Sequence, residues 1–260
     1  IAVPTTSGTG SEVTSFAVVN DTEAKVKYPL ISPSLTADEA ILDAELVKSV
    51  PPAITADTGM DVFTHALESY VSTQHNEFSA ALAEKAVEIC GEFLLRAYLD
   101  GSDMHARQKM HVASCLAGLS FNTAGLGITH SMAHQLGAMF HIPHGRANAM
   151  LLPHIVEFNS DINKHSKSKE VYLPAVHRYA NIAHILGLNN YNPVMTVRSL
   201  VNWIQFMQKE MNIPLTIQEI GTVTPDEYFG AIDKMADAAL ADACTSTNPR
   251  VPTKEDIMKI

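Results

Sequence analysis

ITHSMAHQLGAMFHIPHGRANAMLLPH, residues 128–154, carries five of the chain's 12 histidines. Pro143 suits the first turn of a second helix that begins at His144, after a first helical pattern. Five imidazoles among apolar neighbours are costly to bury, because each ring nitrogen needs a hydrogen-bond partner or a metal ion. The stretch therefore predicts two helices around a metal site, with an ordinary histidine-rich helix pair as the alternative. The five candidates are His130, His134, His141, His144 and His154.

GMDVFTHALESY, residues 59–70, places Asp61 and His65 four residues apart. Apolar residues recur every three or four positions through this segment, which predicts a helix. A carboxylate and an imidazole one turn apart on a helix can bind the same divalent cation. The simpler alternative is an acidic residue that favours a helix N-terminus, followed by an unrelated histidine. Taken with the downstream histidines, the pair indicates a metal shell of mixed nitrogen and oxygen ligands.

The composition is that of a globular chain. It has 260 residues, 46% hydrophobic and 18% charged, which is enough for one large domain or two small ones. The net charge of −10 argues against nucleic acid and anionic membrane as partners. No apolar run has the length of a membrane helix. Cys90, Cys115 and Cys244 are widely spaced and indicate buried thiols of a reducing compartment. We therefore expect a soluble, cytoplasmic protein.

The first 50 residues differ from the rest in residue types and in the spacing of apolar residues. Short β-branched runs surround a loop rich in Gly, Ser and Thr, and AILDA, residues 40–44, has the pattern of a strand. After Pro51 and Pro52 the apolar spacing becomes helical. This change predicts a boundary near residue 50, with strands and loops before it and helices after it.

Terminal signals predict further helices in the second part. Pro193 follows Asn192 as a helix start, and Thr224 with Glu227 forms a capping box. We expect helices over residues 78–99, 104–121, 193–211 and 225–243, and another that begins at Thr253. The histidines that we expect to be ordinary core or surface residues are His75, His105, His111, His165, His177 and His184.

Two other segments carry weaker signals. TTSGTGSE, residues 5–12, offers hydroxyls and open amides to a phosphate or a ribose, but it matches neither GxGxxG nor the P-loop pattern. Spacing alone favours a plain turn there. Cys244 lies in DACTSTNPR, residues 242–250. Nothing about its position in the sequence indicates a lowered pKa for its thiol. We therefore expect Cys244 to be structural.

Four separated motifs give the chain a specific resemblance. PTTSGTGSEVT, GMDVFTHALESYVS, the 128–154 segment and DACTSTNPR resemble, in this order, those of the iron-containing (group III) alcohol dehydrogenases. That family includes propanol- and propanediol-type enzymes and the alcohol dehydrogenase half of bifunctional aldehyde-alcohol dehydrogenases. The resemblance implies a Rossmann-like α/β cofactor domain, of which residues 1–50 are the C-terminal end. Residues 51–260 would form a mainly α, dehydroquinate-synthase-like metal-binding catalytic domain.

The resemblance also assigns roles that spacing leaves open. Periodicity does not separate His130 from His134, since both lie on one helical face. By the family pattern His130 is a metal ligand, and His134 lies near cofactor and substrate. The implied metal ligands are Asp61, His65, His130 and His144. The implied cofactor contacts are Thr5, Thr6, Ser7, Gly8 and Thr9, with Leu42 as an apolar position near the nicotinamide.

The implied activity is NAD(P)-linked oxidation of small aliphatic alcohols or reduction of the corresponding aldehydes. A divalent metal would hold an alkoxide that gives hydride to NAD or NADP, with His134 as one route for the proton. Fe2+ comes from the resemblance, whereas the ligand types alone also accept Zn2+ or another divalent ion. One alternative is a zinc polyol (glycerol-type) dehydrogenase relative, which the fourth ligand candidate disfavours. The other is a catalytically inactive helical interaction module.

The start of the chain gives a further expectation. Residue 1 is Ile, and no Gly-rich turn for a pyrophosphate precedes the 5–12 segment. We therefore expect a segment of a longer protein that by itself binds a dinucleotide weakly. The resemblance also leads us to expect a homo-oligomer, such as a homodimer.

Overall fold

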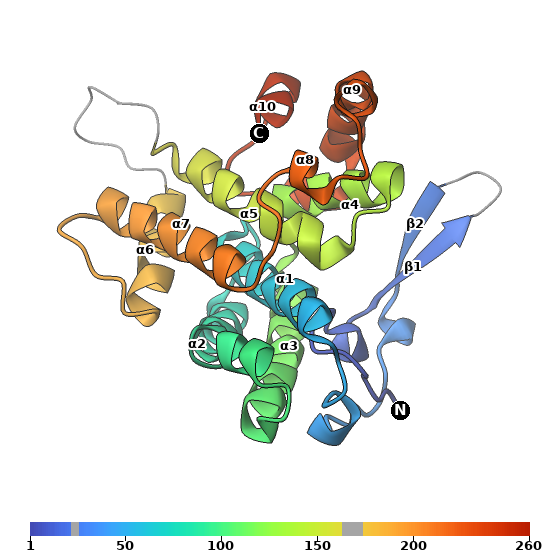
Figure 1. The fold of residues 1–260 in the computed structure, drawn as a ribbon, viewed down its shortest axis with the longest axis vertical. Helices are drawn as coiled ribbons and strands as arrows, with labels where there is room; N and C mark the ends of the chain where they lie inside the picture. Colours follow the sequence, from blue (N-terminus) through green and yellow to red (C-terminus); the bar gives the residue numbers. More distant parts are fainter. Residues whose placement is uncertain (22–25, 163–173) are drawn as a thin grey trace.

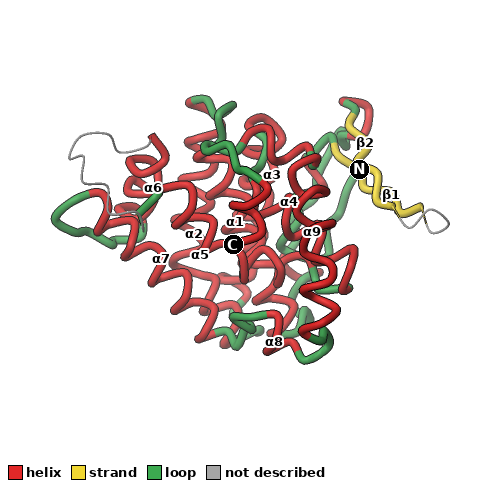
Figure 2. Tube along the Cα trace, turned by 90° about the horizontal axis from the view of Figure 1, so that it is seen from above, coloured by secondary structure: helices red, strands yellow, loops and turns green. Residues whose placement is uncertain are grey.

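The computed structural model describes residues 1–21, 26–162 and 174–260, so that His165 lies outside the described residues. Helices make up most of this structure, which confirms the mainly α fold class. An antiparallel hairpin of β1 (Phe16–Asp21) and β2 (Val26–Ile31) projects from the helical body (Figures 1 and 2). Its register pairs Phe16 with Ile31. The strand-and-loop character predicted for the first 50 residues is therefore present as a hairpin, loops and short 3-10 turns.

The strand predicted for residues 40–44 is wrong. Only Ala40 pairs, in an isolated bridge with Ala2, and a 3-10 turn starts at Ala44. The Asp43 carboxylate accepts a hydrogen bond of 3.0 Å from the Glu45 backbone N–H. Such a local bond caps the turn and competes with strand pairing. The apolar alternation of AILDA was therefore outweighed by the capping preference of one aspartate.

The helices begin where the sequence signals place them. Thr224 and Thr253 form the capping boxes of α9 and α10, and Pro143 is the N-cap of α5 rather than a residue of its first turn. The predicted 225–243 helix ends at Ala241 and is followed by a 3-10 turn, Ala243–Thr247. The helices of the described chain are α1 (Pro52–Val71), α2 (Glu77–Leu99), α3 (Met104–Ala124), α4 (Ile128–Phe140), α5 (His144–Ser160), α6 (Pro174–Ile185), α7 (Pro193–Glu210), α8 (Ile217–Ile220), α9 (Pro225–Ala241) and α10 (Lys254–Lys259).

Helix α1 runs through the centre of the helical body and packs against α2, α3 and α5 (Figure 1). Nearly every residue from Thr55 to Val71 is buried. A helix buried on all sides is normally apolar, and buried polar groups need partners. The polar side chains that α1 nevertheless buries are Thr55, Asp57, Asp61, Thr64, His65, Glu68 and Ser69. Their concentration on one central helix marks the place where a functional site is expected.

Helix α5 joins the two hydrophobic clusters of the body. Ala149, Leu152 and Val156 pack into the larger cluster, which contains α1, whereas another face of α5 belongs to a second cluster together with residues of α4 and α9. Pro153 lies inside α5 and has no N–H to give to the Ala149 carbonyl one turn earlier. The Gln208 side chain of α7 donates to that carbonyl at 2.6 Å. The proline therefore leaves no buried carbonyl unsatisfied, and α7 helps to fix the position of α5.

Within the described residues, no single helix is long and apolar enough to cross a membrane. Helices α3 and α4 meet that test only as a pair, and they are bent by 107° at the break between them.

Candidate metal centre

Helices α1, α4 and α5 bring four predicted ligands together. Asp61 Oδ1 on α1 lies 3.8 Å from His130 Nε2 on α4 and 3.7 Å from His144 Nε2 at the start of α5. His65 Nε2, one turn along α1, lies 4.0 Å from the same oxygen. One ligand atom from each of the four residues lies within 4.8 Å of all the others. The structure therefore assembles the set that the family pattern indicates, from three different helices.

The cluster is buried on one side and open on the other. The side chains of Asp61, His65 and His130 are 5%, 6% and 2% exposed, whereas that of His144 is 41% exposed. On the inner side, the Phe121 ring stacks on His65 with centroids 4.5 Å apart. Among the four, His144 is therefore the side chain that faces solvent.

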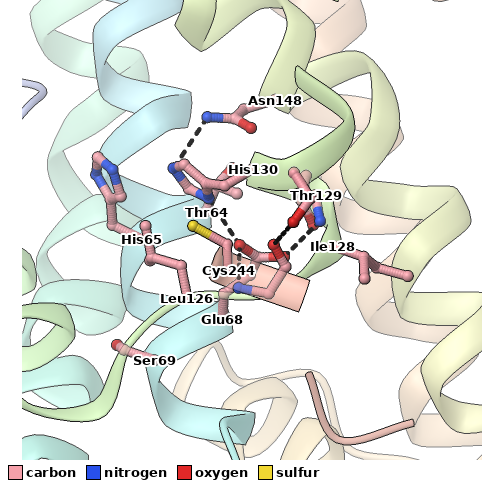
Figure 3. Close-up of polar contacts among 12 residues, drawn as sticks. Thr64, His65, Glu68, Ser69, Leu126, Ile128, Thr129, His130, Asn148 and Cys244 are labelled. Carbon is pink, nitrogen blue, oxygen red and sulfur yellow. Dashed lines mark hydrogen bonds and ion pairs between the residues drawn. The ribbon is translucent and has the colours of Figure 1, made fainter. Parts of the chain in front are cut away.

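The chemistry of the donor atoms fits a cation. His130 Nδ1 lies 2.7 Å from a carboxylate oxygen of Glu68 (Figure 3). If Nδ1 carries the proton, Nε2 presents a lone pair toward Asp61. The Asn148 amide nitrogen lies 2.7 Å from Asp61 Oδ1 and 3.1 Å from Nε2 of both His130 and His144. Its two protons cannot satisfy three acceptors, and a divalent cation would complete the set.

The electrostatics of the cluster favour an ionised Asp61 and neutral rings at His65 and His130. Burial would raise the pKa of Asp61, but His65, His144 and His130 together hold it below its ordinary value. Burial lowers the pKa of His65 and lowers that of His130 well below the ordinary range. Metal binding requires this combination of an ionised carboxylate and neutral imidazoles.

These shifts predict that acid destabilises the metal-free protein. Burial also lowers the pKa of His111, which lies on α3 with Nδ1 2.9 Å from Ser7 Oγ. When the folded-state pKa lies below that of the unfolded chain, the unfolded chain binds more protons, so stability is lost as pH falls through the unfolded value near 6.5. We expect the urea concentration at the denaturation midpoint of the EDTA-treated protein to decrease as the pH is lowered from about 7.5 to about 5.5.

A His111→Gln variant should lose part of this pH dependence, whereas His154→Gln, at an exposed position, should keep it. Midpoint curves for wild type and His111→Gln that run parallel over the whole range would contradict the prediction.

His134 lies one turn after His130 in a different environment. Its Nδ1 is 2.8 Å from Asp242 Oδ2, in the segment that follows α9, and its side chain is 38% exposed. The ring stacks on His144 with centroids 5.4 Å apart. Burial would raise the pKa of Asp242, but His134 holds it below the ordinary value. His134 therefore lies at the open side of the cluster, oriented by an ionised carboxylate.

Cys244 lies close to this pair. His134, Asp242 and Cys244 also present ligand atoms within 4.8 Å of one another. Burial and the nearby carboxylates raise the pKa of the Cys244 thiol well above its ordinary value. A protonated thiol is a poor metal ligand and a poor nucleophile. Of the three cysteines predicted to be buried, only Cys90 is; Cys115 and Cys244 are half-buried.

The predicted cofactor loop lies beside the metal cluster. The Gly8 backbone is close enough to His65 to affect its pKa, and Ser7 contacts His111. The charge of Asp43, next to Leu42, acts on the same His111 ring. Gly8 also packs tightly on α1, where an added Cβ would lie 2.7 Å from Thr58 Cβ. The loop and the Leu42 segment therefore approach α3 on the same side. Thr5 and Thr9 are exposed and Thr6 is half-buried.

The remaining histidines of the 128–154 stretch, His141 and His154, are exposed and stand apart from the cluster. Sequence reasoning missed Glu68, Asn148 and Asp242. Glu68 lies seven residues after Asp61, on the same helical face, and Asn148 lies one turn after His144. These spacings were available as signals. Asp242 lies within the quoted DACTSTNPR motif, but only folding reveals its contact with His134.

Residues 55–260 match the Fe-containing alcohol dehydrogenase family, C-terminal, and residues 1–44 match iron-containing alcohol dehydrogenase. The chain belongs to the iron-containing alcohol dehydrogenase family. The resemblance drawn from the four motifs is thereby confirmed.

Comparison with similar proteins shows what fraction of the length of a family member this chain covers. It is 43% identical to an NADPH-dependent butanol dehydrogenase of Clostridium saccharobutylicum, over 100% of the chain and 63% of that relative. It is 47% identical to a 1-propanol dehydrogenase of Citrobacter freundii, over 96% of the chain and 65% of that relative. A crystal structure of 1,3-propanediol oxidoreductase superposes with a TM-score of 0.90 and 36% identity, covering 99% of this chain and 64% of that one. The chain thus spans less than two thirds of the length of these family members.

Proposed function

We propose that this iron-family chain forms the metal-binding part of an NAD(P)-linked alcohol dehydrogenase, or aldehyde reductase, for short aliphatic substrates. The observation that carries the proposal is the convergence of one carboxylate and three imidazoles from α1, α4 and α5 within 4.8 Å. The named relatives act on butanol, 1-propanol and 1,3-propanediol, which supports a substrate of similar size.

Asp61, His65, His130 and His144 would hold the metal, for which we propose Fe2+ in keeping with the family. The ligand types also suit Zn2+, so the family and not the ligand chemistry supports iron. A divalent ion held there supplies Lewis acidity that lowers the pKa of an alcohol or polarises an aldehyde carbonyl. Asp61 would offset part of its charge, and the buried inner wall around Phe121 would exclude water from that side.

His134 would move the proton. Because Asp242 accepts from Nδ1–H, Nε2 on the opposite edge of the His134 ring is left to exchange a proton with the substrate. In this role His134 is the catalytic residue and Asp242 a positioning residue that fixes the tautomer of the ring. His134 and His144 are both partly exposed, which supports the assignment, because a substrate that enters from solvent would meet these two side chains.

For NAD(P) we propose contacts with the loop of Thr5, Thr6, Ser7, Gly8 and Thr9. Its hydroxyls and amides can donate to a ribose or a pyrophosphate, and the closeness of the Gly8 backbone to His65 would place the cofactor next to the metal. Leu42 would supply an apolar contact to the nicotinamide.

The test measures reduction of propanal by the protein at its full natural length. The sample is loaded anaerobically with Fe2+, and consumption of NADH and of NADPH is followed optically. We expect activity that EDTA abolishes and that Fe2+ restores. Tight metal binding with no consumption of either cofactor, for propanal, butanal and 3-hydroxypropanal alike, would refute the proposed activity and favour a non-catalytic module.

His134→Ala is expected to lower kcat by about 100-fold, at the low end of what general acid–base catalysis contributes. Asp242→Ala should lower kcat by less, because the imidazole remains but its tautomer is no longer fixed. Neither change should alter metal affinity. His141→Ala is the matched control, since this exposed histidine of the same stretch should leave kcat unchanged. A His134→Ala enzyme with wild-type kcat over the whole pH range would remove His134 from the mechanism.

A further inference from the structure

Glu68 lies in the same face of α1 as the two ligands of that helix. It follows His65 by three residues, its side chain is 3% exposed, and it points toward the first turn of α4 (Figure 3). An isolated carboxylate at such depth is costly unless hydrogen bonds satisfy its oxygens. The structure supplies these bonds from a single neighbouring segment.

The donors are the backbone N–H groups at the start of α4. Glu68 Oε2 accepts from Gly127 N at 3.0 Å, and Oε1 accepts from Thr129 N at 2.7 Å. Gly127 is the N-cap of α4 and has no side chain to serve these groups. Glu68 therefore caps α4 from another helix, where the positive end of the helix dipole favours a negative charge.

The same carboxylate meets the ligand His130. Oε2 lies 2.7 Å from His130 Nδ1, and on the far side of that ring Nε2 faces Asp61 Oδ1 at 3.8 Å. Both oxygens of Glu68 already accept backbone N–H groups, so Glu68 acts as an acceptor toward His130 as well, with the proton of the imidazole on Nδ1 and the lone pair on Nε2. A hydrogen bond of this kind fixes the tautomer and orientation of metal-binding histidines.

We propose that Glu68 is the positioning residue of the metal centre: it presents His130 Nε2 as a ligand and at the same time anchors α4 to α1. This inference rests on the proposed metal-dependent function. The proposal explains why a glutamate is buried in a tightly packed body, where it contacts Gly127, Thr129 and His130. A carboxylate that only capped α4 would not need His130 as a third partner.

Glu68→Gln tests the proposal with little change in volume. The amide offers one acceptor and one donor group, so it cannot accept from Thr129 N, Gly127 N and His130 Nδ1 together. We expect the Nε2–H tautomer of His130 to become populated and the affinity for Co2+ to fall about 10–100-fold. Glu68→Asp, which keeps an acceptor-only group, should recover part of the affinity.

The measurements separate positioning from capping. The 15N shifts of the His130 ring, assigned by their loss in His130→Asn, report the tautomer in the metal-free protein, and Co2+ titration reports affinity. The matched control is Asn248→Ala, which removes the acceptor of Ile128 N, at 3.3 Å, on the same turn of α4 without touching His130. We expect this control to lower thermal stability and to leave tautomer and affinity unchanged.

Each outcome decides the question. An Nε2–H tautomer in wild-type protein overturns the proposal, whether or not any variant folds. The proposal is also overturned if the Glu68→Gln protein keeps the wild-type tautomer of His130 and the wild-type affinity for Co2+. Equal losses of affinity in Glu68→Gln and Asn248→Ala would reduce Glu68 to a helix cap. If wild-type protein binds no Co2+ or Fe2+, the proposed metal-dependent function fails, whereas the tautomer result still stands for Glu68.

Discussion

Replacing Asp61 with asparagine is expected to weaken binding of a divalent metal by at least about a thousandfold. Two unit charges 4 Å apart interact with about 4 kcal/mol at an effective dielectric constant near 20, and about 1.4 kcal/mol corresponds to a factor of ten in affinity. Asp61 is the carboxylate on which the imidazoles of His65, His130 and His144 converge. Asparagine keeps the shape and still accepts from Asn148, so the metal-free fold should persist. Titration with Fe2+ and Co2+ under anaerobic conditions gives the affinity.

The control for the Asp61 prediction is Asp233→Asn, because Asp233 is 74% exposed and lies on α9. It loses the same charge and should bind metal like wild type. Retention of metal affinity within about tenfold in Asp61→Asn would mean that the ion, if it binds, is held elsewhere.

Replacing Gly145 with alanine is expected to damage both stability and the metal centre. An added Cβ would lie 2.1 Å from the Asp57 carbonyl oxygen and 3.2 Å from Asp61 Cβ. The first contact is with backbone, so α5 has to move away from α1. The Arg146–Asp57 pair, with N–O distances of 3.0 and 3.2 Å, holds the two helices together at this level and would be strained. Overpacking of this kind costs about 1–3 kcal/mol, occasionally more.

Because His144 precedes Gly145 directly, its displacement from Asp61 should also lower metal affinity. Urea unfolding of the metal-free protein and Co2+ titration measure the two effects. The matched control is Gly230→Ala in α9, where a Cβ would meet no atom within 4 Å. That change should stabilise the protein by about 0.5–1 kcal/mol, since alanine is the better helix former. Unchanged stability in Gly145→Ala would show that α1 and α5 approach each other less closely than in this structure.

The sequence alone was sufficient for those features that depend on local spacing. The three-to-four periodicity around Asp61 and His65 predicts α1, and the capping boxes at Thr224 and Thr253 predict where α9 and α10 begin. A four-residue spacing on a helix places Asp61 and His65 on one face before any tertiary contact is known. The prediction for residues 40–44 was wrong because the Asp43 cap acts over two residues and is stronger than a weak strand pattern.

The rest of the site depends on contacts between distant segments. Helical spacing treats His130 and His134 alike; packing distinguishes them, because one side chain is 2% exposed beside Glu68 and the other 38% exposed beside Asp242. The family pattern had assigned them to different roles by analogy. The physical reason for the different roles is that the two histidines contact different partners, one on α1 and one in the segment after α9. The pattern of residues 128–154 carries no information about these partners.

The four proposed ligands come from three helices, which links metal binding to folding. Asp61 and His65 can meet in a short stretch of nascent helix, whereas His130 and His144 reach them only after α4 and α5 have docked on α1. An ion that needs all four ligands binds the native chain and hardly binds the unfolded one. At a free concentration 100 times the dissociation constant it adds about 2.7 kcal/mol to the stability of the native chain. Metal bound at the proposed site would therefore also indicate completed folding, because a chain that has not closed this cluster would offer the ion no more than half of these ligands.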